Sequence, residues 1–233
     1  MEMRFRIFRF DALVDKEPHY QEYSLSAAPE ERILDCLNRI RWEQDGTLSY
    51  RMSCAHGVCG SDGMRINGVC GLACQKLVKE YEGKEVSLEP LPFFKVQKDL
   101  VVDMEAFLKG IMYFRPWLIT MSNPPEKERR QSPAEAKEVE EAIRCILCAC
   151  CTGACPVMKD NANYVGPAAL VWAFRRVFDS RDEAQSERLK QLDFPDGVWP
   201  CVNYFECTRV CPKQIPVTKC INTLKGEIKK VIT

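Results

Sequence analysis

Two runs of cysteine constrain this chain more than any other feature of its sequence. The first run follows the spacing C-x2-C-x2-C-x3-C and is closed by a proline: Cys145, Cys148, Cys151, Cys155 and Pro156. This spacing is typical of cysteines that hold cubane iron–sulfur clusters, where three thiolates bind one cluster and the fourth binds a second cluster. A run of this kind therefore predicts a partner run elsewhere in the chain.

The partner run lies at residues 201–211 and differs at one position, because Tyr204 occupies the place of the middle cysteine. Four thiolates are then available for a [4Fe–4S] cluster: Cys145, Cys148, Cys151 and Cys211. Three are left for the second cluster: Cys155, Cys201 and Cys207. A phenolate can bind iron, but a bulky residue at this corner favours an empty iron site. The sequence therefore predicts a [3Fe–4S] cluster as the second centre.

A third group of cysteines opens with C-x4-C-x2-D, where the plant-type [2Fe–2S] pattern has C-x4-C-x2-C. Its expected ligands are Cys54, Cys59 and Cys74. The fourth ligand is either Asp62, which occupies the position of the motif, or Cys70, which is the softer donor. We favour Asp62, because the early spacing is the more constrained part of the motif.

Composition narrows the class of protein. Basic and acidic residues number 33 each, so the chain has no global positive charge that would attract nucleic acid. The amino terminus shows no apolar signal-peptide region, and no apolar stretch approaches the roughly 20 residues that span a bilayer. We therefore expect a reducing compartment, in which cysteines serve as metal ligands. Work at a membrane would require docking on other subunits.

Hydrophobic periodicity predicts a coarse fold. Apolar residues alternate as in a strand hairpin over 1–27 and as in a later strand at Val86 and Leu88, while residues 30–42 have a helical period. These elements are compatible with a small β-grasp domain. An exposed linker is expected at 124–131. Helical patterns are expected at four further places: 99–114, from Ser132-Pro133 onward, 167–178 and from Pro216 onward.

Electron transfer is the function that three such clusters can perform. The sequence has no dinucleotide-binding fingerprint, no P-loop and no catalytic triad, so the chain by itself is not expected to transform an organic substrate. A zinc scaffold is the structural alternative for paired cysteines, but zinc sites need neither two interleaved runs nor a terminal Cys-Pro. A soluble multicluster ferredoxin is the functional alternative.

Three stretches carry a resemblance to a known family: C-x4-C-G-S-D-G-x-x-I-N-G with G-L-A-C from Cys54, C-I-L-C-A-C-C-x-x-x-C-P from Cys145, and C-x5-C-x3-C-P-K from Cys201. Together they resemble the iron–sulfur subunit of succinate dehydrogenase and fumarate reductase, over nearly the whole chain. The resemblance implies an α+β chain, with a β-grasp plant-type ferredoxin domain over 1–105 and an all-helical ferredoxin domain over 106–233. In this family the position of Asp62 is held by aspartate or cysteine.

The resemblance also implies partners. It implies a flavoprotein subunit that carries FAD and interconverts succinate and fumarate, and membrane anchor subunits that bind quinone and allow for haem. The chain would then be peripheral on the cytoplasmic face of the inner membrane. Lys225 matches a family lysine at the quinone head group, and Tyr204 lies next to the [3Fe–4S] ligands. The segment after Pro156 lacks the tryptophan of ubiquinone-reducing members, which favours the menaquinone-linked branch.

Overall fold

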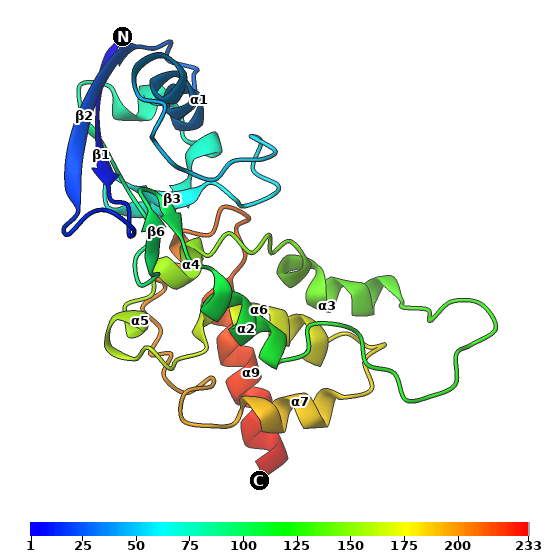
Figure 1. The fold of residues 1–233 in the computed structure, drawn as a ribbon. Coiled ribbons are helices and arrows are strands. Elements are labelled where there is room, and N and C mark those ends of the chain that lie inside the picture. Colours follow the sequence, from blue (N-terminus) through cyan, green and yellow to red (C-terminus); the bar gives the residue numbers. More distant parts are fainter. Residues whose placement is uncertain (233) are drawn as a thin grey trace. The chain divides into compact units, whose positions relative to one another are not determined.

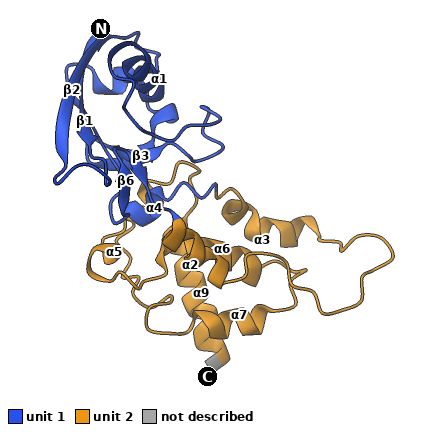
Figure 2. Ribbon diagram, in the orientation of Figure 1, with its two compact units in different colours: residues 1–104, 146–154 blue, residues 105–145, 155–233 orange. Residues whose placement is uncertain are grey.

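The structure is a computed structural model that describes residues 1–232. These residues form two compact units, which Figure 2 shows in separate colours. The first unit contains residues 1–104 and 146–154, and the second contains residues 105–145 and those from 155 onward. The cysteine run at 145–155 therefore contributes to both units. The domain limits 1–105 and 106–233 stay a prediction.

The first unit is built on a five-stranded sheet (Figure 1). Its strands are β1 (Glu2–Arg9), β2 (His19–Ser26), β3 (Gly63–Ile66), β4 (Val69–Leu72) and β5 (Val86–Glu89). They lie in the order β2-β1-β5-β3-β4, with β1 parallel to β5 and the other neighbours antiparallel. Met3, Phe5 and Ile7 are buried on one side of β1, as the alternation in the sequence requires. The expected hairpin over 1–27 and the expected strand at Val86 are confirmed.

A short helix completes the core of the first unit. Helix α1 (Ile33–Arg39) continues into one wider turn, η1 (Ile40–Gln44), before the chain turns at Asp45. The buried side of α1 carries Ile33, Leu34 and Leu37, which are fully enclosed. The predicted helix over 30–42 is confirmed, with limits displaced by two to three residues.

One segment goes beyond the sequence-based expectation, and another differs from it. Strands β3 and β4 form a hairpin around Asn67-Gly68, whose φ angles of 45° and 81° suit the tight turns that Asn-Gly favours. The expectation of a helix over 99–114 was wrong in its first third. The β-branched pair Val101–Val102 forms strand β7, which is antiparallel to β6 (Val96–Lys98). Helix α2 begins only at Glu105.

The regular structure of the second unit, in its described residues, is helical. Its helices are α2 (Glu105–Tyr113), α3 (Pro133–Ile143), α5 (Val157–Asp160), α6 (Gly166–Val177), α7 (Gln185–Leu192), α8 (Glu206–Arg209) and α9 (Val217–Ile232), while α4 (Cys150–Gly153) belongs to the first unit. Helix α6 packs against α2, α3, α7 and α9, and so lies at the centre of this unit. The other expected helices are confirmed at α3, α6 and α9.

Local sequence explains where α3 and α9 begin and what they bury. The Glu135 N–H donates to the Ser132 hydroxyl at 3.3 Å, and the Ser132 N–H donates to the Glu135 carboxylate at 2.7 Å. This capping box satisfies two amides at the start of α3. Ile221, Leu224 and Ile228 are buried on one stripe of α9, as its period predicts.

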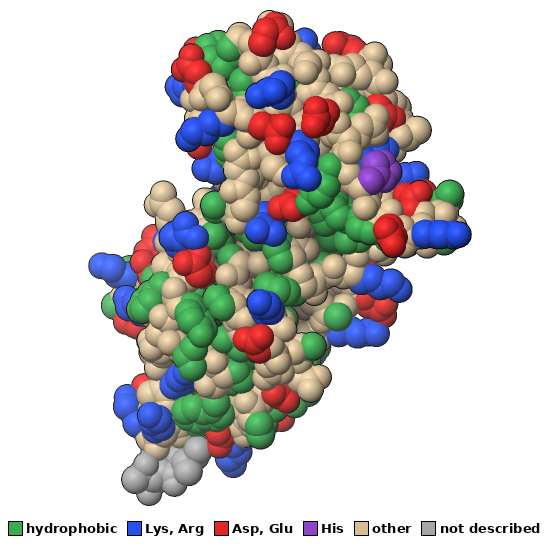
Figure 3. All heavy atoms as spheres, turned by 90° about the vertical axis from the view of Figure 1, so that its left-hand side faces the viewer, with side chains coloured by type: hydrophobic (Ala, Val, Ile, Leu, Met, Phe, Trp, Pro, Cys, Tyr) green, Lys and Arg blue, Asp and Glu red, His purple; other side chains and the backbone are tan. Residues whose placement is uncertain are grey.

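Basic, acidic and hydrophobic side chains are interspersed on the face of the molecule shown in Figure 3. This distribution agrees with the equal numbers of basic and acidic residues. Within residues 1–232, no helix has both the length and the apolar character required to cross a membrane.

Candidate metal centres

The loop from Cys54 to Cys59, in the first unit, aims backbone amides at a sulfur atom. The N–H groups of His56, Val58 and Cys59 donate to the Cys54 Sγ at 3.5, 3.4 and 3.2 Å. These hydrogen bonds, led by that of His56, lower the pKa of the Cys54 thiol to about 6. Since the thiolate is the form that binds metal, the loop prepares Cys54 to act as a ligand. Cys59 lies within the same loop, and the Cys54 N–H donates to its Sγ at 3.4 Å.

Glycine is required where this loop turns and where another segment approaches it. Gly57 and Gly60 have φ angles of 76° and 71°, which side-chain-bearing residues rarely adopt. A Cβ at Gly60 would lie 2.8 Å from the backbone oxygen of Ile146, and one at Gly63 would lie 2.6 Å from that of Cys148. The segment that carries Cys148 therefore packs directly on the loop, within the first unit.

The structure separates the two candidates for the fourth ligand of this loop. Asp62 is 3% exposed, and its Oδ2 accepts the N–H of Cys74 at 2.6 Å. Burial and the Asp62 carboxylate raise the pKa of the Cys74 thiol to about 12. Burial raises the pKa of the Cys70 thiol to about 11, and a Cβ at Gly153 would lie 3.4 Å from the Cys70 Sγ. Asp62 is thus the candidate that contacts Cys74.

Ser61 contacts a sulfur of this loop, although no ligand motif includes it. Its Oγ lies 3.0 Å from the Cys59 Sγ. A hydroxyl next to a candidate ligand can donate a hydrogen bond to the thiolate. Its position one residue before Asp62 is the only signal that the sequence offers.

The four [4Fe–4S] candidates are divided between the units. Cys148 and Cys151 belong to the first unit, and Cys145 and Cys211 belong to the second. In the first unit, hydrogen bonds from Cys150 lower the pKa of the Cys148 thiol despite its burial. The hydrogen bond to Cys148 and burial raise the pKa of the Cys150 thiol, which is fully buried.

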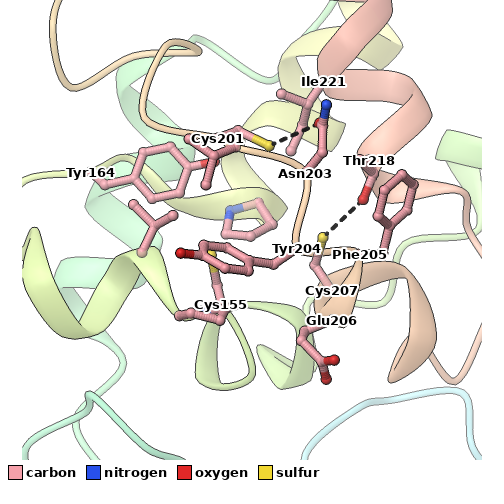
Figure 4. A pocket seen from close by; sticks show the side chains of 14 residues that line it. Cys155, Tyr164, Cys201, Asn203, Tyr204, Phe205, Glu206, Cys207, Thr218 and Ile221 are labelled. Carbon is pink, nitrogen blue, oxygen red and sulfur yellow. Dashed lines mark hydrogen bonds between the residues drawn. The ribbon is translucent and has the colours of Figure 1, made fainter.

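Three cysteines of the second unit converge on one pocket, which Figure 4 shows and which we call the three-cysteine pocket. It is lined by Cys155, Cys201 and Cys207, together with Tyr204. Burial raises the pKa of the Cys155 thiol, and the charges of Cys207 and Cys201 raise it further, which places the three sulfurs within electrostatic reach of one another. The structure therefore brings together the three residues predicted for the [3Fe–4S] site.

Two further residues singled out from the sequence lie in this pocket or contact a residue that lines it. Tyr204 lines the pocket but is 57% exposed, so part of its ring faces outward. Lys225, on α9, donates its Nζ to the backbone oxygen of Cys201 at 2.5 Å. This bond ties the lysine to Cys201, one of the three cysteines of the pocket.

Within residues 1–232, no three His, Cys, Asp or Glu side chains are close enough together to hold one metal ion. A cluster places several metal atoms between its ligands, so its cysteines can stand further apart than those of a tetrahedral zinc site.

Comparison with known proteins agrees with the two kinds of cysteine pattern. Residues 4–109 match the model of the 2Fe-2S iron-sulfur cluster binding domain, and residues 141–215 match that of the 4Fe-4S dicluster domain. The chain is 40% identical to the succinate dehydrogenase iron-sulfur subunit of Coxiella burnetii over 97% of both chains. The chain belongs to the family of succinate dehydrogenase and fumarate reductase iron–sulfur subunits.

Other members of this iron–sulfur subunit family extend the match. The fumarate reductase iron-sulfur subunit of Mycobacterium tuberculosis is 37% identical over 94% of this chain and 90% of its own length. A chain of the Mycobacterium smegmatis Sdh1 complex in the apo form superposes with a TM-score of 0.85, at 26% identity, over 98% of this chain and 96% of its own. The predicted family and the coarse fold, a sheet followed by helices, are thereby confirmed.

Proposed function

We propose that this iron–sulfur subunit carries electrons through three clusters between a flavoprotein that interconverts succinate and fumarate and a membrane quinone. The observation that carries the proposal is the three-cysteine pocket, where exactly one position of a cubane pattern is replaced by Tyr204. When bound, the clusters supply one-electron redox chemistry at potentials set by their type and surroundings. The chain's own residues hold those clusters and tune them.

We assign the [2Fe–2S] site to Cys54, Cys59, Asp62 and Cys74. The amide hydrogen bonds to Cys54 support the assignment, because they stabilise the thiolate that the site needs. Asp62 is favoured over Cys70 because its carboxylate accepts the N–H of Cys74, whereas the Cys70 Sγ packs near Gly153. A carboxylate ligand must be deprotonated to bind, as must the thiols.

We assign the [4Fe–4S] site to Cys145, Cys148, Cys151 and Cys211 on their spacing. One feature of the first unit fits a cluster near Cys151. The hydroxyl of Thr152 is buried and has no hydrogen-bond partner among residues 1–232. Buried hydroxyls without partners are rare in native proteins, and a sulfur atom of a bound cluster would provide the missing acceptor.

We assign the [3Fe–4S] site to Cys155, Cys201 and Cys207. Tyr204 stands at the fourth corner without a thiolate to offer, which supports three iron atoms rather than four. Burial of Cys155 and Cys207 limits the access of water to the site. Tyr204 and Lys225 are the residues that we place near the quinone.

Partners and location complete the proposal. We propose a β-grasp ferredoxin domain over 1–105 that faces the FAD-carrying flavoprotein, and a helical ferredoxin domain over 106–233 that faces membrane anchors. The strand order β2-β1-β5-β3-β4, in which β1 and β5 are parallel, supports the β-grasp domain. The anchors, with or without haem, would hold the chain on the cytoplasmic face of the membrane. Menaquinone is the quinone that the sequence after Pro156 favours.

Electron paramagnetic resonance of the purified complex tests the cluster types. We expect a [3Fe–4S] signal in the oxidised sample, and [2Fe–2S] and [4Fe–4S] signals after reduction with dithionite. Tyr204→Cys should supply the fourth thiolate and abolish the oxidised trinuclear signal. The matched control is Phe205→Cys, which adds a thiol at the neighbouring position and should leave that signal unchanged. An unchanged oxidised spectrum in the Tyr204 variant would contradict the assignment.

A second pair of variants tests the ligands of the binuclear site. Asp62→Ala should remove or strongly alter the [2Fe–2S] signal, because the carboxylate that contacts Cys74 is lost. Cys70→Ser should leave the signal in place. The reverse result would assign the fourth ligand to Cys70.

A further inference from the structure

The hydroxyl of Thr218 contacts one sulfur of the three-cysteine pocket. Thr218 lies in the first turn of α9 and is 1% exposed. Its Oγ1 lies 3.5 Å from the Sγ of Cys207, the contact drawn as a dashed line in Figure 4. This is within the range of a hydrogen bond to sulfur.

Thr208 holds the Thr218 side chain in this position. The two hydroxyl oxygens are 3.0 Å apart, and the backbone N–H of Thr218 donates to the Thr208 oxygen at 3.0 Å. Thr208 directly follows Cys207 and lies on α8, so the contact ties the start of α9 to the helix that carries the ligand. The two threonines and the cysteine form a short, buried hydrogen-bonded chain.

The direction of the hydrogen bonds follows from the chemistry of a ligand. A cysteine bound to iron is a thiolate and has no proton to donate. The bond between Thr218 and Cys207 must then run from the hydroxyl to the sulfur. The lone pairs of the Thr218 oxygen remain open to the hydroxyl proton of Thr208, because the Thr208 oxygen already accepts an N–H. Each hydroxyl in the chain has one donor role and one acceptor role.

We propose that Thr218, held by Thr208, is a positioning residue that raises the reduction potential of the trinuclear centre by hydrogen bonding to the Cys207 sulfur. The inference rests on the proposed ligand set of that centre. Reduction adds negative charge, part of which is carried by the ligand sulfurs, so a hydrogen bond to sulfur is stronger in the reduced state. Hydrogen bonds to the sulfurs are among the factors that set cluster potentials. A buried donor acts with little screening by water.

The consequence for electron transfer is directional. A raised potential favours the reduced state at the centre nearest to Tyr204 and Lys225, so electrons arriving from the other clusters would be held there.

Redox titration of the purified complex, followed by the oxidised [3Fe–4S] signal, tests the inference. Thr218→Val removes the hydroxyl at nearly constant volume. We expect the midpoint potential of this variant to fall. At a potential equal to the wild-type midpoint, the ratio of oxidised to reduced centre should therefore rise about two- to tenfold, which is the effect of losing one hydrogen bond. Thr218→Ser keeps the donor and should restore the wild-type midpoint. Thr208→Val should shift the midpoint in the same direction but by less.

The matched control lies on the same helix. The hydroxyl of Thr223 is exposed and donates to the carbonyl of Lys219, so Thr223→Val should leave the midpoint unchanged. An unchanged midpoint potential in Thr218→Val, with an intact [3Fe–4S] signal, would overturn the inference. If Thr218→Val assembles no trinuclear centre, an unchanged midpoint potential in Thr208→Val would overturn it instead. Absence of the trinuclear signal from the wild-type complex would instead overturn the proposed function.

Discussion

Arg188 offers the sharpest test of what holds the helical unit together. Its guanidinium has five N–H donors, and all five are used within the unit. Two donate to the carboxylate of Asp182 at 3.0 and 2.8 Å, and three donate to the backbone oxygens of Phe114, Arg115 and Trp117 at 2.7 to 2.9 Å. The Arg188 and Asp182 side chains are 2% and 1% exposed. One side chain on α7 thus fixes the turn that follows α2.

The expected cost of removing Arg188 follows from this burial. In Arg188→Met the Asp182 carboxylate stays buried with only two partners, the N–H groups of Ile119 and Ala184, at 3.0 Å each. Loss of one member of a buried ion pair lowers the free energy of unfolding by about 3–5 kcal/mol, because the other charge is left uncompensated. At about 2–4 °C per kcal/mol for a chain of this length, the melting midpoint should fall by roughly 6–20 °C.

Heating of the purified complex, with acid-labile sulfide measured after each temperature step, gives the apparent midpoint. A double variant, Arg188→Met with Asp182→Asn, removes the uncompensated charge, so its melting midpoint should fall by less than that of Arg188→Met alone. Arg130→Met is the matched control, because the Arg130 side chain is 82% exposed and its ion pair with Glu128 is in solvent. A fall of less than about 2 °C in Arg188→Met would refute the reasoning, since it would mean that the buried pair contributes no more than an exposed one.

Three further predictions concern the first unit. Gly60→Ala should prevent assembly of the [2Fe–2S] cluster and abolish its signal, because the added Cβ would lie 2.8 Å from the backbone oxygen of Ile146. Gly83→Ala is the control, since Gly83 has a similar φ of 69° but no atom within 4 Å of an added Cβ, and this variant should retain the signal. Burial opposes ionisation of Asp45, yet hydrogen bonds, led by those from Thr47, hold the pKa of its carboxyl well below the ordinary value. This carboxylate therefore stabilises the fold above pH of about 4, and the stabilisation is lost as the pH falls further, so the melting midpoint should drop as the pH falls below about 4 and should drop less in Asp45→Asn. Burial raises the pKa of Cys36 to about 12, so iodoacetamide at pH 8 should alkylate this thiol only after unfolding, and peptide mass analysis showing modification of the native complex would contradict its enclosure.

Short-range rules account for much of this structure. The capping residues before α3, the stripe of α9 and the alternation of β1 each depend on neighbours a few positions apart, and the structure has all three. The segment over 99–104 departed from its helical pattern because β6 was available to pair with Val101–Val102. That pairing partner could be identified only from the folded chain.

The sequence alone predicts the number and kind of metal centres, because cluster ligands are close along the chain in fixed spacings and a substitution such as Tyr204 changes the count of thiolates directly. The surroundings of each sulfur were decided only by the tertiary structure. Thr218 is eleven positions from Cys207 and carries no motif, yet helix packing places its hydroxyl against that sulfur. The spacing of the motif already favours Asp62 over Cys70, but only the structure shows that Asp62 accepts the N–H of Cys74 while the Cys70 Sγ packs near Gly153. Hydrogen bonding and burial depend on which residues are neighbours in space, so the spacing of residues along the chain does not predict them.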